Sequence, residues 1–549
     1  MANVKKITIY DAQGNPTTYN VKDNVSGYEV ASNKATSLDN PSNTTYPTTK
    51  AVSDAIKVFI STINVTASTY GPITCTNGDK TYTKTGDNVE FEVISGTWTI
   101  SNSDASKTIT VVEPNNYYVN LAEVYGIKRY TKNTSPYWTR TDNAVGLTAT
   151  ASVGSTAGHS DFDNVYPYSE MERVTLSTGD VMVKIPKFYY LRTIDSSGYE
   201  LIKISKDYEE GFKLHPAFDR PDGVRDYIYV GAYKTSGDIY GSNNKSVSGV
   251  SPQVNQTRAT MRTNAKAKGA GWGIIDLSTL SAIQMLMMVE FANNDMQTEI
   301  GEGYTASSHE SAINTGSCDN VPNLTGRPAG TSNNVDVVWR GIEGFWGNLF
   351  EFTDGLNIYN NSYYICNNPA NYADDTSTNY ELLSYIGIQS SGGYISQMGL
   401  DINNSYVMMP VQAIGTSTQY YTDYVHKPTT SGWAILVHSG HWRDGLEDGL
   451  FSMYAGVRSS TKDVNCGSRL QYLPPLNSNM WGINYVENCR KYNKTWNFTN
   501  NRRWKISLHQ KRHSSNHKTT RWARIYALSI LRELYAIRRL ENIRRHLPK

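Results

Sequence analysis

The stretch SGWAILVHSGHWRDGLEDGLFSMYAGVRSSTKDVNCGSRLQYLP, residues 431–474, holds the most regular pattern in this chain. Glycines and large apolar residues recur in it, and polar side chains fill the positions between them. Glycine permits tight turns with positive φ, and Trp and Phe can anchor a loop in a core. Anchors that alternate with polar residues suit the display of a binding surface. The expected anchors are Gly440, Trp442, Gly445, Gly449, Phe451, Gly467 and Arg469.

The residues between these anchors are the candidate binding residues. They are polar or adaptable, as expected of a surface that contacts a partner. The alternative is an ordinary glycine-rich loop with charged, exposed positions, and composition alone does not exclude it. The candidates are His441, Arg443, Asp444, Glu447, Asp448, Ser452, Tyr454, Arg458, Lys462, Asp463 and Asn465.

The composition of the whole chain agrees with a recognition protein. Its 549 residues include 39 Tyr and 42 Gly, and Asn, Ser and Thr are abundant. Tyrosine offers a large, rigid contact at low entropic cost, and the small polar residues offer adaptable hydrogen bonds. The same composition also occurs in long β-rich fibres. A chain of this length predicts two to four domains.

Charge is distributed unevenly. Residues 486–549 contain 17 basic and three acidic residues, which gives +14 and leaves −12 for the rest of a chain whose total is +2. The body is therefore mildly acidic and predicts no specific nucleic-acid partner. The N-terminal MANVKKITIY lacks an apolar signal region, and no apolar run of about 18 residues follows. We therefore expect synthesis in the cytoplasm without a signal peptide and no membrane span.

Two regions are expected before the main body. Residues 1–61 form an attachment or oligomerisation region, with a hairpin over 1–20, a polar linker over 31–47 and a short helix carrying Val52, Ile56 and Phe59. Residues 62–115 contain short alternating segments between Gly, Asn and Asp, which predict a small β-sandwich spacer.

The main body is predicted to span residues 117–485 and to be α+β. Helices are expected over 257–269 and 276–294, the second with an apolar stripe of Ile283, Leu286, Met287 and Phe291. Its methionines favour core filling over a binding groove. After residue 300, short strands and long loops predict a strand-poor half.

The basic segment 486–549 differs from the rest of the chain. It predicts a helix over about 519–546. Three explanations of this helix compete. It could be an accessory element that binds nucleic acid or membrane, or a packed C-terminal helix. It could also be translated from sequence that was not selected as protein. No function is assigned to it.

The anchor spacing G-x-W-x-x-G-x-x-x-G-x-F, followed by GSRL, resembles the variable segment of C-type-lectin-like proteins that are diversified by retroelements, a class to which phage major tropism determinants belong. RGIEGFWGNLFEFTDGLN (340–357) resembles the G-N-x-x-E-W signature of the formylglycine-generating-enzyme branch of that fold. Asn348 and Glu351 match it, and Phe352 replaces the usual Trp. Residues 160–176 and 211–218 are similar to gut-phage tail proteins, and 33–56 to a linker-helix repeat of phage tail fibres.

This resemblance covers most of residues 31–474 and implies a receptor-binding protein, an adhesin, on a virion tail. The implied partners are a host-cell surface receptor, protein or glycan, and other tail proteins, and a homotrimer is expected. In the resembling class, an Asn codon diversified at adenines reaches His, Arg, Asp, Ser and Tyr but not Glu, Lys or Met. Glu447 and Lys462 are therefore weaker candidates than their neighbours.

The protein is expected to be non-enzymatic, and two enzyme classes are the alternatives. A relative of the formylglycine-generating oxidase needs two adjacent thiolates for copper, but Cys466 and Cys489 are 23 positions apart and Cys75, Cys318 and Cys366 are farther away. The spacing of the five cysteines also predicts no zinc site.

A tail-associated polysaccharide hydrolase needs two facing carboxylates, for which Glu343, Glu351 and Asp354 are candidates. Asn348 and Glu351 are expected instead to tie loops together. No cofactor or metal is expected. Asp354 and Asp401 are conceivable Ca²⁺ ligands, although no calcium-loop motif is present.

Overall fold

The computed structural model describes residues 60–476, except 103–105, 113, 122, 238–243 and 428–430, together with four short strands nearer the N-terminus. The predicted hairpin is present, because β1 (Val4–Tyr10) pairs antiparallel with β2 (Pro16–Lys22). Within the predicted linker, β3 (Lys34–Ala35) pairs in parallel with β4 (Tyr46–Pro47). The predicted helix near Val52 and the segment 486–549 lie outside the described residues.

Five strands form the module that follows. Two long strands, β5 and β6, pair along most of their length, and β5 also pairs with β7 and β9. The strands belong to one hydrogen-bonded sheet that encloses a core containing Phe91 and Trp98. A β-rich module was expected here, but its strands are continuous in one sheet instead of divided between two. The strands are β5 (Ser61–Thr76), β6 (Thr81–Val93), β7 (Gly96–Ser101), β8 (Ser106–Val111) and β9 (Asn116–Asn120).

Because β9 pairs with β5, residues 116–120 belong to the preceding module and not to the body that was expected to start at residue 117. The body begins at β10 with two five-stranded sheets. In the second, the late strand β37 pairs with β22 on one side and β23 on the other, so the end of the described body closes the sheet begun by its first half. The first sheet has the order β11 (Thr139–Asp142), β10 (Val124–Tyr130), β18 (Tyr199–Ser205), β17 (Tyr189–Ile194) and β19 (Lys213–Leu214). The second has the order β15 (Glu172–Thr175), β16 (Val181–Pro186), β22 (Tyr227–Lys234), β37 (Arg469–Tyr472) and β23 (Trp272–Ile274).

An eight-stranded sheet dominates the C-terminal half. The prediction of a strand-poor half was wrong, because short strands that are far apart in sequence pair with one another here. The order is β29 (Glu381–Ile386), β28 (Ser362–Ile365), β27 (Phe350–Tyr359), β34 (Trp433–His438), β35 (Met453–Val457), β33 (Tyr424–His426) and β30 (Gly392–Tyr394), and β36 (Cys466–Gly467) pairs in parallel with β27.

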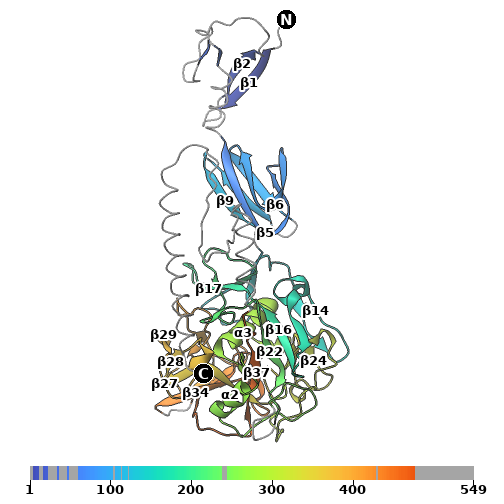
Figure 1. Ribbon diagram of the computed structural model, residues 1–549, viewed down its shortest axis with the longest axis vertical. Coiled ribbons are helices and arrows are strands. Elements are labelled where there is room, and N and C mark those ends of the chain that lie inside the picture. The colour runs from blue at the N-terminus through green and yellow to red at the C-terminus, as the bar shows by residue number, and fades with distance from the viewer. Residues whose placement is uncertain are drawn as a thin grey trace, which may run out of the picture. The chain divides into compact units, whose positions relative to one another are not determined.

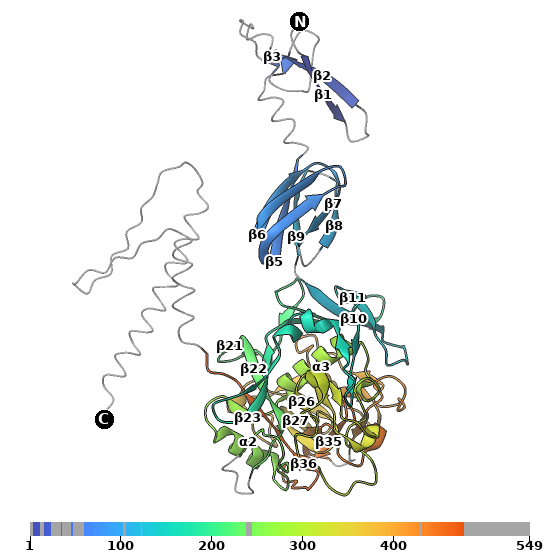
Figure 2. The same ribbon diagram turned by 90° about the vertical axis from the view of Figure 1, so that its right-hand side faces the viewer.

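Both predicted helices are present. In α2 (Arg258–Lys266) the side chain of Thr257 caps the N-terminus, and in α3 (Leu277–Phe291) the side chain of Asp276 does so. A short α4 (Met296–Glu299) follows. Helix α3 lies inside the body against β10, β18 and β27 (Figures 1 and 2).

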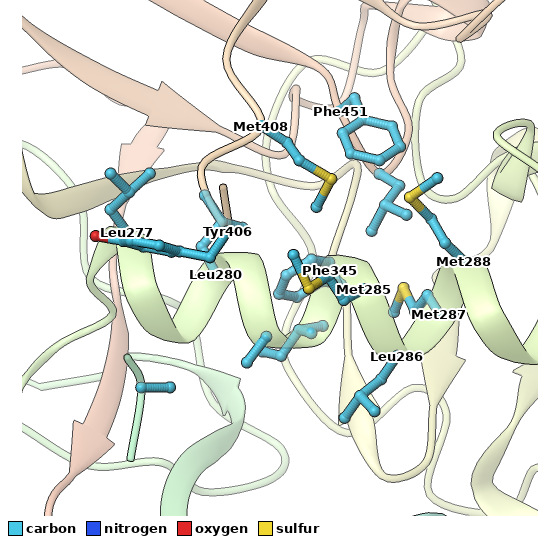
Figure 3. Close-up of a cluster of buried hydrophobic side chains, with 14 of the residues drawn as sticks. Leu277, Leu280, Met285, Leu286, Met287, Met288, Phe345, Tyr406, Met408 and Phe451 are labelled. Carbon is cyan, nitrogen blue, oxygen red and sulfur yellow. The ribbon is translucent and has the colours of Figure 1, made fainter. Parts of the chain in front are cut away.

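The whole of α3 is buried, not only the expected apolar stripe. The methionines fill the core, as predicted: Met285 and Met288 lie beneath Phe451 and Met408 in Figure 3. Its buried polar residues have partners. The Gln284 side-chain amide donates to the Leu450 carbonyl at 3.1 Å, and the Trp339 indole donates to the Glu290 carboxylate at 2.8 Å. Because Phe451 and Leu450 rest on α3, the core of the body supports the loop that carries the candidate residues.

Candidate functional site

Residues 431–474 contribute strands to two sheets. β34 and β35 run antiparallel in the eight-stranded sheet, and the loop 439–452 connects them. After β35 the chain crosses to β36 and then to β37 in the second five-stranded sheet. The candidate loop is thus fixed at both ends by sheets.

A buried ionic centre joins these two sheets. Arg469 of β37 donates from Nη2 to Oε1 of Glu351 at 2.7 Å and from Nε to Oε2 at 3.0 Å. Lys234 of β22 donates from Nζ to the same Oε1 at 2.9 Å. Burial alone would raise the pKa of Glu351, but Arg469 and then Lys234 outweigh it and lower this pKa to about 2. Glu351 is therefore an ionised, internally paired group.

Asn348 ties the loop before β27 to a distant segment. Its backbone has a positive φ of 62°. Its side-chain oxygen accepts from the Ile313 backbone N at 3.1 Å, and its amide nitrogen donates to the Ile313 carbonyl at 3.3 Å. The signature residues Asn348 and Glu351 thus connect loops and strands.

Two anchor glycines make close approaches that a side chain would prevent. A Cβ on Gly440 would lie 1.5 Å from Oδ1 of Asp448, and one on Gly449 would lie 2.0 Å from Oδ1 of Asp423. Both glycines also have positive φ, 66° and 134°. The loop is therefore folded back on itself around two buried carboxyl groups.

The apolar anchors are buried as expected. Trp442 is 5% exposed and Phe451 is fully buried. The Phe451 backbone N donates to Oδ2 of Asp423 at 2.7 Å. Gly445 has a φ of +61° with open space around it, and Gly467 is buried in β36.

The eleven candidate binding residues fall into three groups by burial. Four are exposed, five are half-buried and two are buried. The exposed residues are Arg443, Arg458, Lys462 and Asp463, and the half-buried ones are His441, Asp444, Glu447, Tyr454 and Asn465.

The two buried candidates, Asp448 and Ser452, correct the sequence-based prediction. Both are at most 1% exposed, so neither can contact a receptor without opening the loop. Asp448 lies against Gly440, and burial, followed by the nearby Asp444, raises the pKa of Asp448 well above its usual value. Position between glycines does not decide exposure, because a loop that folds back buries part of its own polar side chains.

Four ring-bearing residues line one face of the eight-stranded sheet. Tyr394 of β30 is the cross-strand partner of Tyr424 of β33, and His426 is the partner of Tyr454 of β35. Tyr424 and His426 are two positions apart on one strand, so their side chains point to the same side. All four are half-buried, whereas the intervening Val425 is buried beneath them.

The rings form a continuous run. The centroids are 5.2 Å apart for Tyr394 and Tyr424, 4.5 Å for Tyr424 and His426, and 5.6 Å for His426 and Tyr454. Phe350 continues the run, at 6.4 Å from Tyr454 and 5.1 Å from His441. We call Tyr394, Tyr424, His426, Tyr454, His441 and the adjoining Glu447 the aromatic face.

Carboxylates accompany the imidazoles of this face. Oε2 of Glu447 lies 3.1 Å from Nε2 of His426, and Oδ1 of Asp444 lies 3.5 Å from Nε2 of His441. Burial, followed by the nearby His426, lowers the pKa of His441 to about 4, and burial also lowers the pKa of His426. Both imidazoles are therefore neutral near pH 7 and can accept or donate hydrogen bonds.

Sequence reasoning included His441, Glu447 and Tyr454 but missed Tyr394, Tyr424 and His426. These three lie outside residues 431–474 and join the face only through strand pairing. The alternation in TDYVH, residues 422–426, was the available signal, because Tyr424 and His426 share one side of a strand.

The cysteine positions give no support to oxidase chemistry. Cys466 is buried and unpaired by disulfide, and burial raises the pKa of its thiol to about 12. Cys75, Cys318 and Cys366 are also buried free thiols. Cys489 lies outside the described residues.

The carboxylates considered for hydrolysis are occupied. The backbone nitrogens of Gly316 and Cys318 donate to Glu343 at 2.6 and 2.8 Å, and Arg469 holds Glu351. Asp354 borders a pocket beside Trp272, but Arg262 holds both its oxygens at 2.9 Å. All three carboxylates are thus engaged by groups of the protein itself.

The two carboxylates considered for calcium are likewise occupied. Asp354 is paired with Arg262, and Asp401 accepts from the backbone nitrogens of Ser384, Asn403 and Asn404, each at 2.9 Å. Both carboxylates are therefore engaged by groups of the protein itself. Within the described ranges, no group of three or more His, Cys, Asp or Glu side chains is arranged to hold a metal ion.

Among the helices of the described part of the chain, none combines the length and apolarity needed to cross a membrane.

Neither a protein-family model nor a curated protein matches the chain. Among solved structures, PvdO from Pseudomonas aeruginosa is similar over 55% of this chain and 98% of its own, with 10% sequence identity and a TM-score of 0.23. A likeness at that score carries no argument about fold or activity.

Proposed function

We propose that this chain is a non-enzymatic phage tail adhesin. Its body, which begins at β10, has a C-type-lectin-like fold and binds a receptor on the host-cell surface. The aromatic face makes the central contact, and the exposed Arg443, Arg458, Lys462 and Asp463 of residues 431–474 contribute less. The sequence resemblance of residues 31–474 supports the fold and the virion location.

The observation that carries the proposal is the aromatic face itself. Three strands from separate parts of the sequence bring half-buried rings into one run, and two of its members belong to the segment singled out by its anchor spacing. Tyr and Arg dominate the energetic centres of interfaces, and charged rims contribute less. The aromatic face gathers side chains of the kind that contribute most at interfaces.

The support beneath the face favours binding without rearrangement. Phe451 and Trp442 anchor the loop, and the ionic centre of Glu351, Arg469 and Lys234 holds the neighbouring strands. Preorganised groups lose less entropy when they bind. Other tail proteins hold the N-terminal region, and several copies, as in a trimer, increase the avidity on one particle.

The test is attachment of the fluorescently labelled full chain to a panel of intact bacterial strains, measured by flow cytometry. The variants Tyr454→Ala and Tyr424→Ala should each weaken attachment to the strains that the parent binds, by about tenfold or more. The matched control is Tyr118→Ala in β9, because Tyr118 is 78% exposed and lies outside the body. Absence of binding to every strain, or equal binding by all variants, contradicts the proposal.

A further inference from the structure

The aromatic face has polar groups at the edges of its rings. Tyr394, Tyr424 and Tyr454 carry hydroxyl groups, and Glu447 lies beside His426 at 3.1 Å. Burial and then the charge of Glu447 raise the pKa of Tyr394. The face therefore alternates flat ring surfaces with hydrogen-bond donors and acceptors.

The charge of the face is close to balanced. His426 and His441 are neutral near pH 7, and two half-buried carboxyl groups, Glu447 and Asp444, lie beside them. The exposed cations Arg443, Arg458 and Lys462 lie in the same segment as the exposed Asp463. Arg458 is engaged within the protein, because it donates to the carbonyls of Trp433 and Ser431 at 2.6 and 2.9 Å. These charges do not favour a strongly acidic or basic partner.

The face also lacks a large apolar centre. Among the described residues of 431–474, the large hydrophobic side chains that are exposed are Leu446 at 50% and Val464 at 55%. Stable protein interfaces usually have a fully buried apolar core within a polar rim. Half-buried rings with polar edges fit a partner that is itself flat on one side and polar at its edges.

On the basis of the proposed function, we infer that the receptor recognised by the aromatic face is a glycan of low net charge. The C–H face of a sugar ring packs on the rings of Tyr424 and Tyr454. Its hydroxyl groups hydrogen-bond to the Glu447 carboxylate and to the imidazoles of His426 and His441. A site that uses buried or half-buried polar groups in this way rejects partners that cannot satisfy them.

The test uses the full chain and a strain that the parent binds. The cells are treated with periodate, which oxidises sugar diols, or with protease, and attachment is measured with untreated cells as reference. Polysaccharide purified from the same strain is added as a competitor. We expect periodate to reduce attachment by about tenfold or more, protease to leave it unchanged, and the polysaccharide to compete.

Two variants connect the result to the face. Glu447→Gln keeps the shape of the side chain but removes its charge, and Tyr424→Ala removes one ring. Both should weaken binding of the purified polysaccharide about tenfold or more while Tyr118→Ala binds as the parent. Thermal melts in parallel show that the variants fold.

The possible failures are distinguishable. Loss of attachment after protease but not periodate identifies a protein receptor, which overturns the glycan inference and leaves the adhesin proposal standing. If cell attachment is periodate-sensitive but both variants bind polysaccharide as the parent does, the glycan lies on another surface and the inference fails. If no strain is bound at all, the proposed function itself fails.

Discussion

The ionic centre and the aromatic face are built partly from the same segment but use their polar groups in opposite ways. In the ionic centre, Glu351 and Arg469 are fully buried and satisfy each other. On the aromatic face, Tyr454 and Glu447 remain half-buried, so part of their surface stays available. The comparison shows that polarity in a loop-rich segment does not by itself indicate a binding site. Burial and internal pairing separate structural polar residues from those that can contact a partner.

The largest expected effect is in the ionic centre. Arg469→Ala removes the partner of a buried carboxylate and leaves Glu351 with Lys234 alone. Breaking a buried pair in this way costs about 3–5 kcal/mol. Urea unfolding of the variant and the parent measures it. A loss below about 1 kcal/mol would show that the centre does not hold the two sheets together.

Trp442→Ala tests the anchor between the two regions. The ring is 5% exposed, and its removal leaves a cavity under the loop. Large-to-small changes of this kind cost roughly 3–5 kcal/mol. The free energy of unfolding should fall and receptor binding should weaken together. Unchanged stability would indicate that the ring does not anchor the loop.

Only part of the fold and of the candidate site can be predicted from the sequence. Helices α2 and α3 were predictable, because apolar spacing and the caps at Thr257 and Asp276 are local signals. The aromatic face was only half predictable, because Tyr394 and Tyr424 reach it through strand pairing between distant segments. The spacing of the glycines predicts Asp448 at the surface, but the structure buries it. Its burial depends on how the loop folds over Gly440, which the spacing does not encode.

A change of pH is expected to have an intermediate effect on stability, through Asp444. Burial raises the pKa of Asp444 to about 6, above its ordinary value of about 3.9 in an unfolded chain. A carboxyl group with a raised pKa binds its proton more tightly in the folded state. Stability from this group is therefore fully present below pH 4 and is lost as the pH rises through 6.

Asp444→Asn should therefore raise the melting temperature near pH 7 and reduce the part of the pH dependence that lies between pH 4 and 7. Melting curves of the parent and the variant at pH 4, 5, 6, 7 and 8 measure this. Identical pH profiles for the two proteins would show that Asp444 does not titrate in this range. Lys462→Ala, at an exposed position, is the control.

The smallest effect on stability is expected at exposed residues of 431–474. Lys462→Ala and Asp463→Asn change side chains that lie at the surface. Such changes usually alter the free energy of unfolding by less than about 0.5 kcal/mol. Urea unfolding is again the measurement. A larger loss would mean that Lys462 and Asp463 have structural roles. Exposure would then not distinguish structural residues from residues that can contact a partner.

The most direct test of the central claim compares a residue of the aromatic face with a residue of the segment that lies off it. Tyr424 belongs to the face but lies outside residues 431–474, and Arg443 is exposed within that segment but is not part of the face. The measurement is the dissociation constant of each alanine variant on one strain that the parent binds. We predict that Tyr424→Ala weakens binding about tenfold or more and that Arg443→Ala weakens it by about threefold at most. The reverse order would contradict the claim that the aromatic face is the centre of the binding site.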